Sequence, residues 1–148
     1  MPTMLRNVLA VIAGVVVGAL VNGGLITLGP SLIPPPAGVD MTTTEGLVAG
    51  IALLEPRHYV MPFLAHAIGT LAGALVAYLL AATHKSRIAY VVGALFLCGG
   101  IAASFMIPAP VWFIAVDLLL AYFPMAWLAI RIGSAIQQDR GTIQTRVA

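Results

Sequence analysis

Four long apolar stretches dominate the chain, and short polar segments separate them. They cover residues 8–28, 59–83, 88–107 and 111–130. A helix needs about 20 mostly apolar residues to cross the hydrocarbon core of a bilayer. Backbone groups in lipid must be paired within their own segment, and continuous runs of this kind achieve that only as helices. The pattern predicts an all-α fold: a bundle of four transmembrane helices within residues 1–136, followed by a polar tail at 137–148.

The composition strengthens this prediction. Hydrophobic residues make up 61% of the 148 residues and charged residues only 8%, whereas a soluble domain carries about 25% charged residues. The net charge of +2 and the scattered basic residues argue against a nucleic-acid interface. Cys98 is the single cysteine and lies in an apolar run. With no second thiol and no other ligand motif, we expect neither a metal nor a cofactor.

The charged residues predict an orientation. On one side of the predicted bundle, Arg57 is the single basic residue, and the acids Asp40, Glu45 and Glu55 lie on the same side. The basic residues of the other side are Arg6, Lys85, Arg87, Arg131, Arg140 and Arg146. By the positive-inside rule, both termini are cytoplasmic in a bacterial inner membrane. The first stretch is longer than the roughly 7–15 apolar residues of a cleaved signal peptide, so we expect it to be retained as a helix.

The longest connection, residues 29–58, is predicted to lie on the outer side. It contains three consecutive prolines from Pro34, which favour an extended backbone. Thr42 and Glu45 have the spacing of a capping box, in which two side chains pair with amides at a helix start. A short amphipathic helix is therefore expected at about 43–54. The connection is either a lid over a substrate vestibule or a plug that seals the bundle.

The two halves of the chain resemble each other. Each contains Val-Gly-Ala-Leu, then Gly-Gly, then Ile-Pro, within 17–36 and again within 92–110. Such an echo predicts two parallel hairpins, an arrangement known from transporters. It places His66 and Asp117 at equivalent positions, roughly 9–11 Å below the outer surface at 1.5 Å per residue. The two side chains can meet if the second and fourth helices are neighbours.

Small residues predict how the helices pack. The pairs Gly14/Gly18 and Gly69/Gly73 both have the GxxxG spacing that lets helix backbones approach closely in lipid. We therefore expect the first and second helices to be in close contact. In the fourth stretch Pro124 removes a backbone hydrogen bond, so a kink is expected there.

Asp117 is the residue that most needs an explanation. An aspartate at the centre of a membrane helix costs about 2.5–3.5 kcal/mol. Three explanations are open: a buried pair with His66 that specifies helix register, a site that handles protons or ions, or solvation at the outer interface. Asn22, near the outer end of the first helix, either joins this network or only bridges helices.

Catalysis has little support in the sequence. The chain has no Cys/His nucleophile pair and no HExxH motif, and its histidines are spread over both membrane faces. His66 and Asp117 amount to two thirds of a catalytic triad, but Ser104 is the only serine near a matching depth. We expect that the protein is not an enzyme, and an intramembrane hydrolase is the least favoured alternative.

The arrangement resembles a group of small bacterial membrane proteins with four spans. The shared marks are the proline-rich connection at 32–36, the Ala-His-Ala-Ile-Gly-Thr-Leu-Ala-Gly run at 65–73 and the Pro-Ala-Pro-Val-Trp-Phe-Ile-Ala-Val-Asp run at 108–117. The likeness covers nearly the whole chain. It implies the four-span fold and carries no activity with it.

The leading functional hypothesis is therefore a non-enzymatic membrane protein that packs with itself or with a partner membrane protein in the lipid bilayer. In this hypothesis the His66/Asp117 pair specifies the packing. The alternative is a small transporter or channel in which the same pair carries protons or coordinates an ion.

Overall fold

The computed structural model describes residues 1–147, with side chains described as far as Asp139. Its long helices are α1 (Thr3–Leu32), α3 (Val60–Leu80), α4 (Lys85–Met106), α5 (Val111–Leu120) and α6 (Phe123–Val147). Four segments are long and apolar enough to cross a membrane, with α5 and the first part of α6 together forming the fourth. The predicted all-α bundle of four membrane helices is confirmed.

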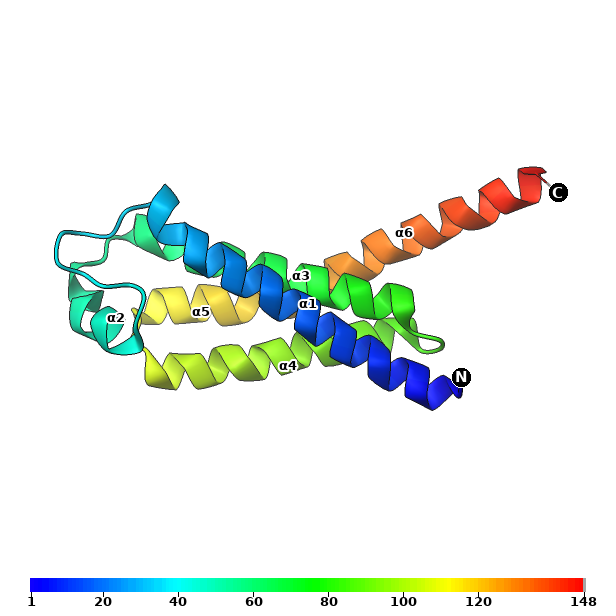
Figure 1. Ribbon diagram of the computed structural model, residues 1–148, viewed down its shortest axis with the longest axis horizontal. Helices are drawn as coiled ribbons and strands as arrows, with labels where there is room; N and C mark the ends of the chain where they lie inside the picture. The colour runs from blue at the N-terminus through cyan, green and yellow to red at the C-terminus, as the bar shows by residue number, and fades with distance from the viewer. Residues whose placement is uncertain (148) are drawn as a thin grey trace.

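Helix α3 lies at the centre of the bundle. It packs against α1, α4 and α6, and its longest contact is with α1. Both chain ends lie at the same end of the bundle as the turn between α3 and α4, and the α1–α3 connection lies at the opposite end (Figure 1). We call these the termini end and the α2 end, after the short helix α2 (Thr44–Gly50) in the connection.

The α1–α3 contact is close because glycines lie on both sides of it. A Cβ added to Gly14 would lie 2.6 Å from the carbonyl oxygen of Gly73, and one added to Gly18 would lie 2.7 Å from that of Gly69. Real Cβ atoms essentially never come this near to another backbone, so any larger residue would push the helices apart. Asn22 continues the same face of α1, where its Cβ packs over Gly69.

The start of α1 also holds the turn at the termini end. The Arg6 side chain donates to the carbonyl of Leu80 at 2.9 Å, and the Asn7 side chain accepts from the amide of Ala82 at 2.9 Å. These bonds satisfy backbone groups that the end of α3 leaves unpaired. His84 then adopts a left-handed conformation, with φ of 50°, and reverses the chain into α4.

The fourth span is broken where the sequence predicted a kink. Helix α5 ends at Leu120 and α6 begins at Phe123, one residue before Pro124. Proline cannot donate to the carbonyl four residues earlier, here that of Leu120, so the helix cannot continue regularly. Helix α6 leaves the bundle at an angle (Figure 1) and continues as helix through the polar tail to Val147. Ala148 lies outside the described residues.

The connection between α1 and α3 contains the expected short helix. It is formed by α2 and the following 3-10 turn η1 (Ile51–Leu53), close to the predicted range 43–54. The predicted capping box is wrong by one residue. Thr43 caps the helix by accepting from the amide of Gly46, while the Thr42 hydroxyl donates to Asp40. Hydrogen bonds from the hydroxyl and the amide of Thr42 lower the pKa of Asp40 below its ordinary value.

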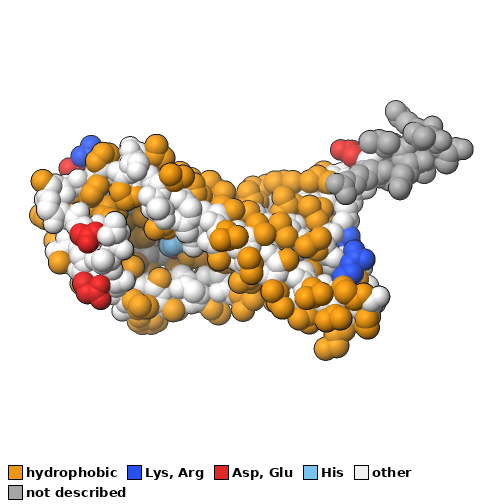
Figure 2. All heavy atoms as spheres, viewed as in Figure 1, with side chains coloured by type: hydrophobic (Ala, Val, Ile, Leu, Met, Phe, Trp, Pro, Cys, Tyr) orange, Lys and Arg blue, Asp and Glu red, His pale blue; other side chains and the backbone are white. Residues whose placement is uncertain are grey.

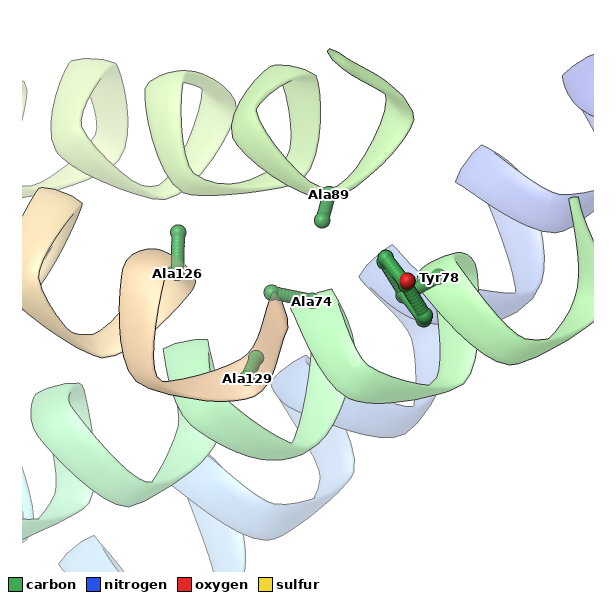
Figure 3. Close-up of a cluster of buried hydrophobic side chains, with 5 residues drawn as sticks. All are labelled: Ala74, Tyr78, Ala89, Ala126 and Ala129. Carbon is green, nitrogen blue, oxygen red and sulfur yellow. The ribbon is translucent and has the colours of Figure 1, made fainter. Parts of the chain in front are cut away.

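Near the termini end, the middle of the bundle is closed by small side chains. Figure 3 shows side chains from α3, α4 and α6 converging there. The cluster consists of Ala74, Tyr78, Ala89, Ala126 and Ala129. The four alanines are completely buried, so the helices approach closely there. The bundle is wider at the α2 end, where α5 has only sparse contacts with α3 and α4.

Candidate functional site

His66 and Asp117 form a direct contact between α3 and α5. Nδ1 of the histidine lies 2.8 Å from Oδ1 of the aspartate. Asp117 is only 5% exposed, so solvation at the interface does not explain it. The structure brings together the two residues that the sequence placed at equal depth, and it makes them partners.

Tyr122 completes this group, and it has no counterpart in the sequence prediction. Its hydroxyl donates to the second carboxylate oxygen of Asp117 at 2.9 Å. The tyrosine is 1% exposed, and its ring stacks on His66 with centroids 6.1 Å apart. Gly100 of α4 makes room for it, since a Cβ there would collide with the hydroxyl. We call His66, Asp117 and Tyr122 the polar triad.

The break in the fourth span allows the Tyr122 side chain to reach Asp117. Tyr122 lies in the two-residue gap between α5 and α6, five positions after Asp117. In a regular helix, residues five apart point away from each other, because neighbours on one face are three or four apart. No spacing signal in the sequence pointed to Tyr122, since the backbone conformation of the break decides where its side chain lies.

A cavity of about 200 Å³ lies over the polar triad on the side of the α2 end. His66 and Asp117 line it together with mostly apolar residues of every spanning segment. Figure 2 shows the molecule hollowed beneath the connection, with a histidine side chain inside the hollow. The lining from the helices includes Ile26, Tyr59, Pro62, Gly100, Ala103, Ser104, Phe113, Ile114 and Leu118.

The α1–α3 connection roofs the cavity with apolar side chains. Met41, Leu47, Ile51 and Leu54 all line it. Leu47, Ile51 and Leu54 belong to the apolar face of the predicted short helix, and Met41 precedes that helix. They cover the cavity without filling it, an arrangement that fits both a lid and a plug that seals the bundle.

His58 fastens this roof to the bundle. This residue is only 2% exposed. Its Nδ1 accepts from the amide of Glu55 at 2.9 Å, which leaves the hydrogen on Nε2. Nε2 then donates to the carbonyl of Pro34 at 3.2 Å. The histidine thus ties the proline segment of the connection to the start of α3.

The other candidate polar residues lie outside the triad. Asn22 packs in the α1–α3 contact, where its buried Oδ1 has no hydrogen-bond partner among the described residues. It therefore contributes packing to this contact and does not extend the network of Asp117. Ser104 lines the cavity, but its hydroxyl donates to the carbonyl of Ile101 at 2.7 Å.

Within the described residues, no group of three or more histidine, cysteine or acidic side chains is arranged to hold a metal ion. No family model matches the chain, and neither a curated protein nor a solved structure matches it. The site geometry is therefore the basis for any functional proposal.

Proposed function

We propose that this protein is a non-enzymatic membrane protein in which the polar triad holds α3, α5 and α6 in register. One observation carries the proposal: both carboxylate oxygens of Asp117 are engaged by donors from the protein itself, His66 and Tyr122. A carboxylate satisfied on both oxygens inside the bundle serves as a fixed point for packing, and removing a partner from such a group is costly.

The proposal is tested by proton flux into liposomes that contain the purified protein, wild type against Asp117→Asn, with thermal unfolding recorded on the same samples. We expect no flux from either protein. We also expect the variant to unfold at a lower temperature, with its free energy of unfolding reduced by about 1–3 kcal/mol. The single oxygen of the amide cannot accept hydrogen bonds from both His66 and Tyr122. Flux in the wild type that the variant loses at unchanged stability would overturn the proposal.

A proton- or ion-coupled transporter or channel is the second candidate. It is favoured by one observation, that His66 is ionisable and borders the cavity while bonded to Asp117. Ionisable residues inside a membrane are frequently parts of proton pathways. Against it stands the alanine cluster, which closes the bundle between the triad and the termini end. The flux measurement separates the two candidates.

A hydrolase requires a hydroxyl nucleophile activated by His66. Ser104 is the serine on the cavity wall, and it gives its hydrogen to a carbonyl of its own helix. This arrangement supports the non-enzymatic proposal, and we rank the hydrolase last.

For location, we propose a bacterial inner membrane with both termini in the cytoplasm. Figure 2 shows lysine and arginine side chains near the termini end and acidic side chains on the α2 end, where Arg57 is paired with Glu55. The bonds of Arg6 and Asn7 to the α3–α4 turn bring Arg6 to the same end as Lys85 and Arg87. The resemblance to small bacterial four-span proteins agrees with this location and remains part of the proposal.

A homo-oligomer or a partner membrane protein remains part of the same proposal. The four glycines of the two GxxxG motifs are already used between α1 and α3. An association within the bilayer therefore has to use other surfaces. The exposed apolar side chains of α1 form one such surface, and they include Leu9, Ile12, Val16 and Leu20.

A further inference from the structure

We infer that the cavity over the polar triad binds a small lipophilic molecule with a hydroxyl group, which donates a hydrogen bond to Nε2 of His66. This goes beyond the proposed function, because a packing role for the triad requires no ligand. The inference rests on the cavity's size, the state of the His66 ring and a second polar group in the cavity wall.

The size and lining of the cavity set the general class of ligand. A cavity of about 150 Å³ lined by apolar side chains holds a benzene molecule, and this one measures about 200 Å³. It therefore suits one or two rings, or a short chain. The wall is formed mostly by aliphatic and aromatic side chains such as Ile114, Phe113 and Leu118. A charged ligand would lose its hydration there without compensation.

The His66 ring determines which polar group the ligand needs. The Asp117 carboxylate can only accept, so it assigns a hydrogen to Nδ1 of His66. In the neutral ring this leaves Nε2 as an acceptor. Nε2 has no hydrogen bond to any described residue, and the side chain is 22% exposed on the cavity wall. A hydroxyl donor is the lipophilic group that matches it.

Tyr59 is a second observation that points to a ligand. It lines the same cavity and is only 6% exposed. Its hydroxyl is buried, yet within the described part of the chain it has no hydrogen-bond partner. Leaving such a group unpaired costs about 1–3 kcal/mol. An acceptor on a bound ligand that reaches this part of the wall would pair the hydroxyl.

Two sources can supply such a ligand, namely the bilayer around the helices and the water at the α2 end. A hydroxyl compound dissolved in the bilayer and one arriving from the water at the α2 end both carry an apolar body and one donor. The shared class is thus a neutral lipophilic alcohol or phenol, and the test must separate these two sources.

The test uses two matched probes, 1-naphthol and 1-methoxynaphthalene, which differ in whether the oxygen carries a hydrogen. Binding is measured by equilibrium dialysis against full-length protein in phosphatidylcholine nanodiscs, with empty nanodiscs subtracted. We expect saturable binding of one naphthol per chain, about tenfold tighter than the ether, as one hydrogen bond of about 1.4 kcal/mol would produce.

Two variants test the placement. His66→Phe should reduce naphthol affinity to that of the ether, and Ile114→Trp should remove the binding of both by filling the cavity. His84→Asn, at the termini end, is the matched control and should bind like the wild type. Thermal unfolding identifies a variant that has not folded. In that case, the comparison of the two probes on wild-type protein still shows whether the ligand needs a hydroxyl hydrogen.

Three results of the binding measurements would overturn the inference: no saturable binding above empty nanodiscs, equal affinity for the two probes, or unchanged binding in a folded Ile114→Trp protein. Competition then identifies the source. Displacement of naphthol by 1-decanol added with the lipid indicates the bilayer, and displacement only by phenol added to the water indicates the outer solution. Displacement by neither contradicts the hydroxyl requirement.

Discussion

At the scale of single residues, Asp117 illustrates how a membrane helix tolerates a carboxylate. Each of its oxygens accepts one hydrogen bond, from His66 and from Tyr122, and the side chain is almost fully enclosed. Hydrogen bonds to a charged acceptor are about twice as strong as neutral ones. The two donors offset much of the insertion cost of about 2.5–3.5 kcal/mol.

Tyr122→Phe tests this account with the loss of a single hydroxyl. We expect a loss of about 1–3 kcal/mol in the free energy of unfolding, because one oxygen of Asp117 would stay buried without its donor. The measurement is reversible unfolding in detergent micelles. Tyr90→Phe is the control, since the Tyr90 hydroxyl makes no hydrogen bond in the described structure and phenylalanine keeps the contacts of its ring with Phe123 and the alanine cluster. Equal stability of the two variants would contradict the role given to Tyr122.

Only part of this network was predictable. The depth of His66 and Asp117 follows from counting residues along two apolar runs, so their meeting was an expectation. Tyr122 was not predictable, because a break in the backbone turns it toward Asp117. The capping residue was also misplaced: Asp40 engages the Thr42 hydroxyl and leaves Thr43 to cap α2, a competition between side chains that the motif spacing does not show.

At the scale of helices, the chain contains glycines of two kinds. Gly14, Gly18, Gly69 and Gly73 lie within the α1–α3 contact, where backbone faces backbone. Gly24 of the same helix α1 has open space around it, with nothing within 4 Å of a Cβ placed there. Sequence spacing distinguishes the GxxxG pairs, but the contact itself determines which glycines cannot be replaced.

The pair Gly73→Ala and Gly24→Ala makes this difference measurable. We expect Gly73→Ala to destabilise the bundle by about 1–3 kcal/mol, because its Cβ would lie 2.6 Å from the carbonyl oxygen of Gly14. Gly24→Ala should stay within about 1 kcal/mol of wild type or be slightly more stable, since alanine favours helix. Both are measured by unfolding in the same micelles. If Gly24→Ala were the more harmful of the two, the α1–α3 contact would be misassigned.

At the scale of the whole molecule, the two ends of the bundle differ in their charged residues and in the presence of a cavity. The termini end holds Arg6, Lys85 and Arg87 and is closed by the alanine cluster. The α2 end holds acids and the roofed cavity. In the proposed orientation, which follows the positive-inside rule, the termini end lies in the cytoplasm, so the cavity is expected to face the outer side of the membrane.

This orientation is checked with single cysteines in a Cys98→Ala background. The first variant is Ala49→Cys, at an exposed position on α2. The second is Ser86→Cys, at an exposed position between Lys85 and Arg87. In spheroplasts, a membrane-impermeant maleimide should label Ala49→Cys and leave Ser86→Cys unlabelled, whereas lysis should expose both. The reverse pattern would contradict the orientation and would place the cavity on the cytoplasmic side.

The sequence by itself determined the number of spans, their helical state, the short helix of the connection and the break near Pro124. All of these follow from hydrophobic length and from backbone hydrogen bonding, which act locally along the chain. The tertiary structure alone decided that Tyr122 joins Asp117, that His58 fastens the α1–α3 connection and that a cavity lies over His66. These depend on how helices far apart in sequence approach each other, because packing, and not local preference, sets the spaces between them.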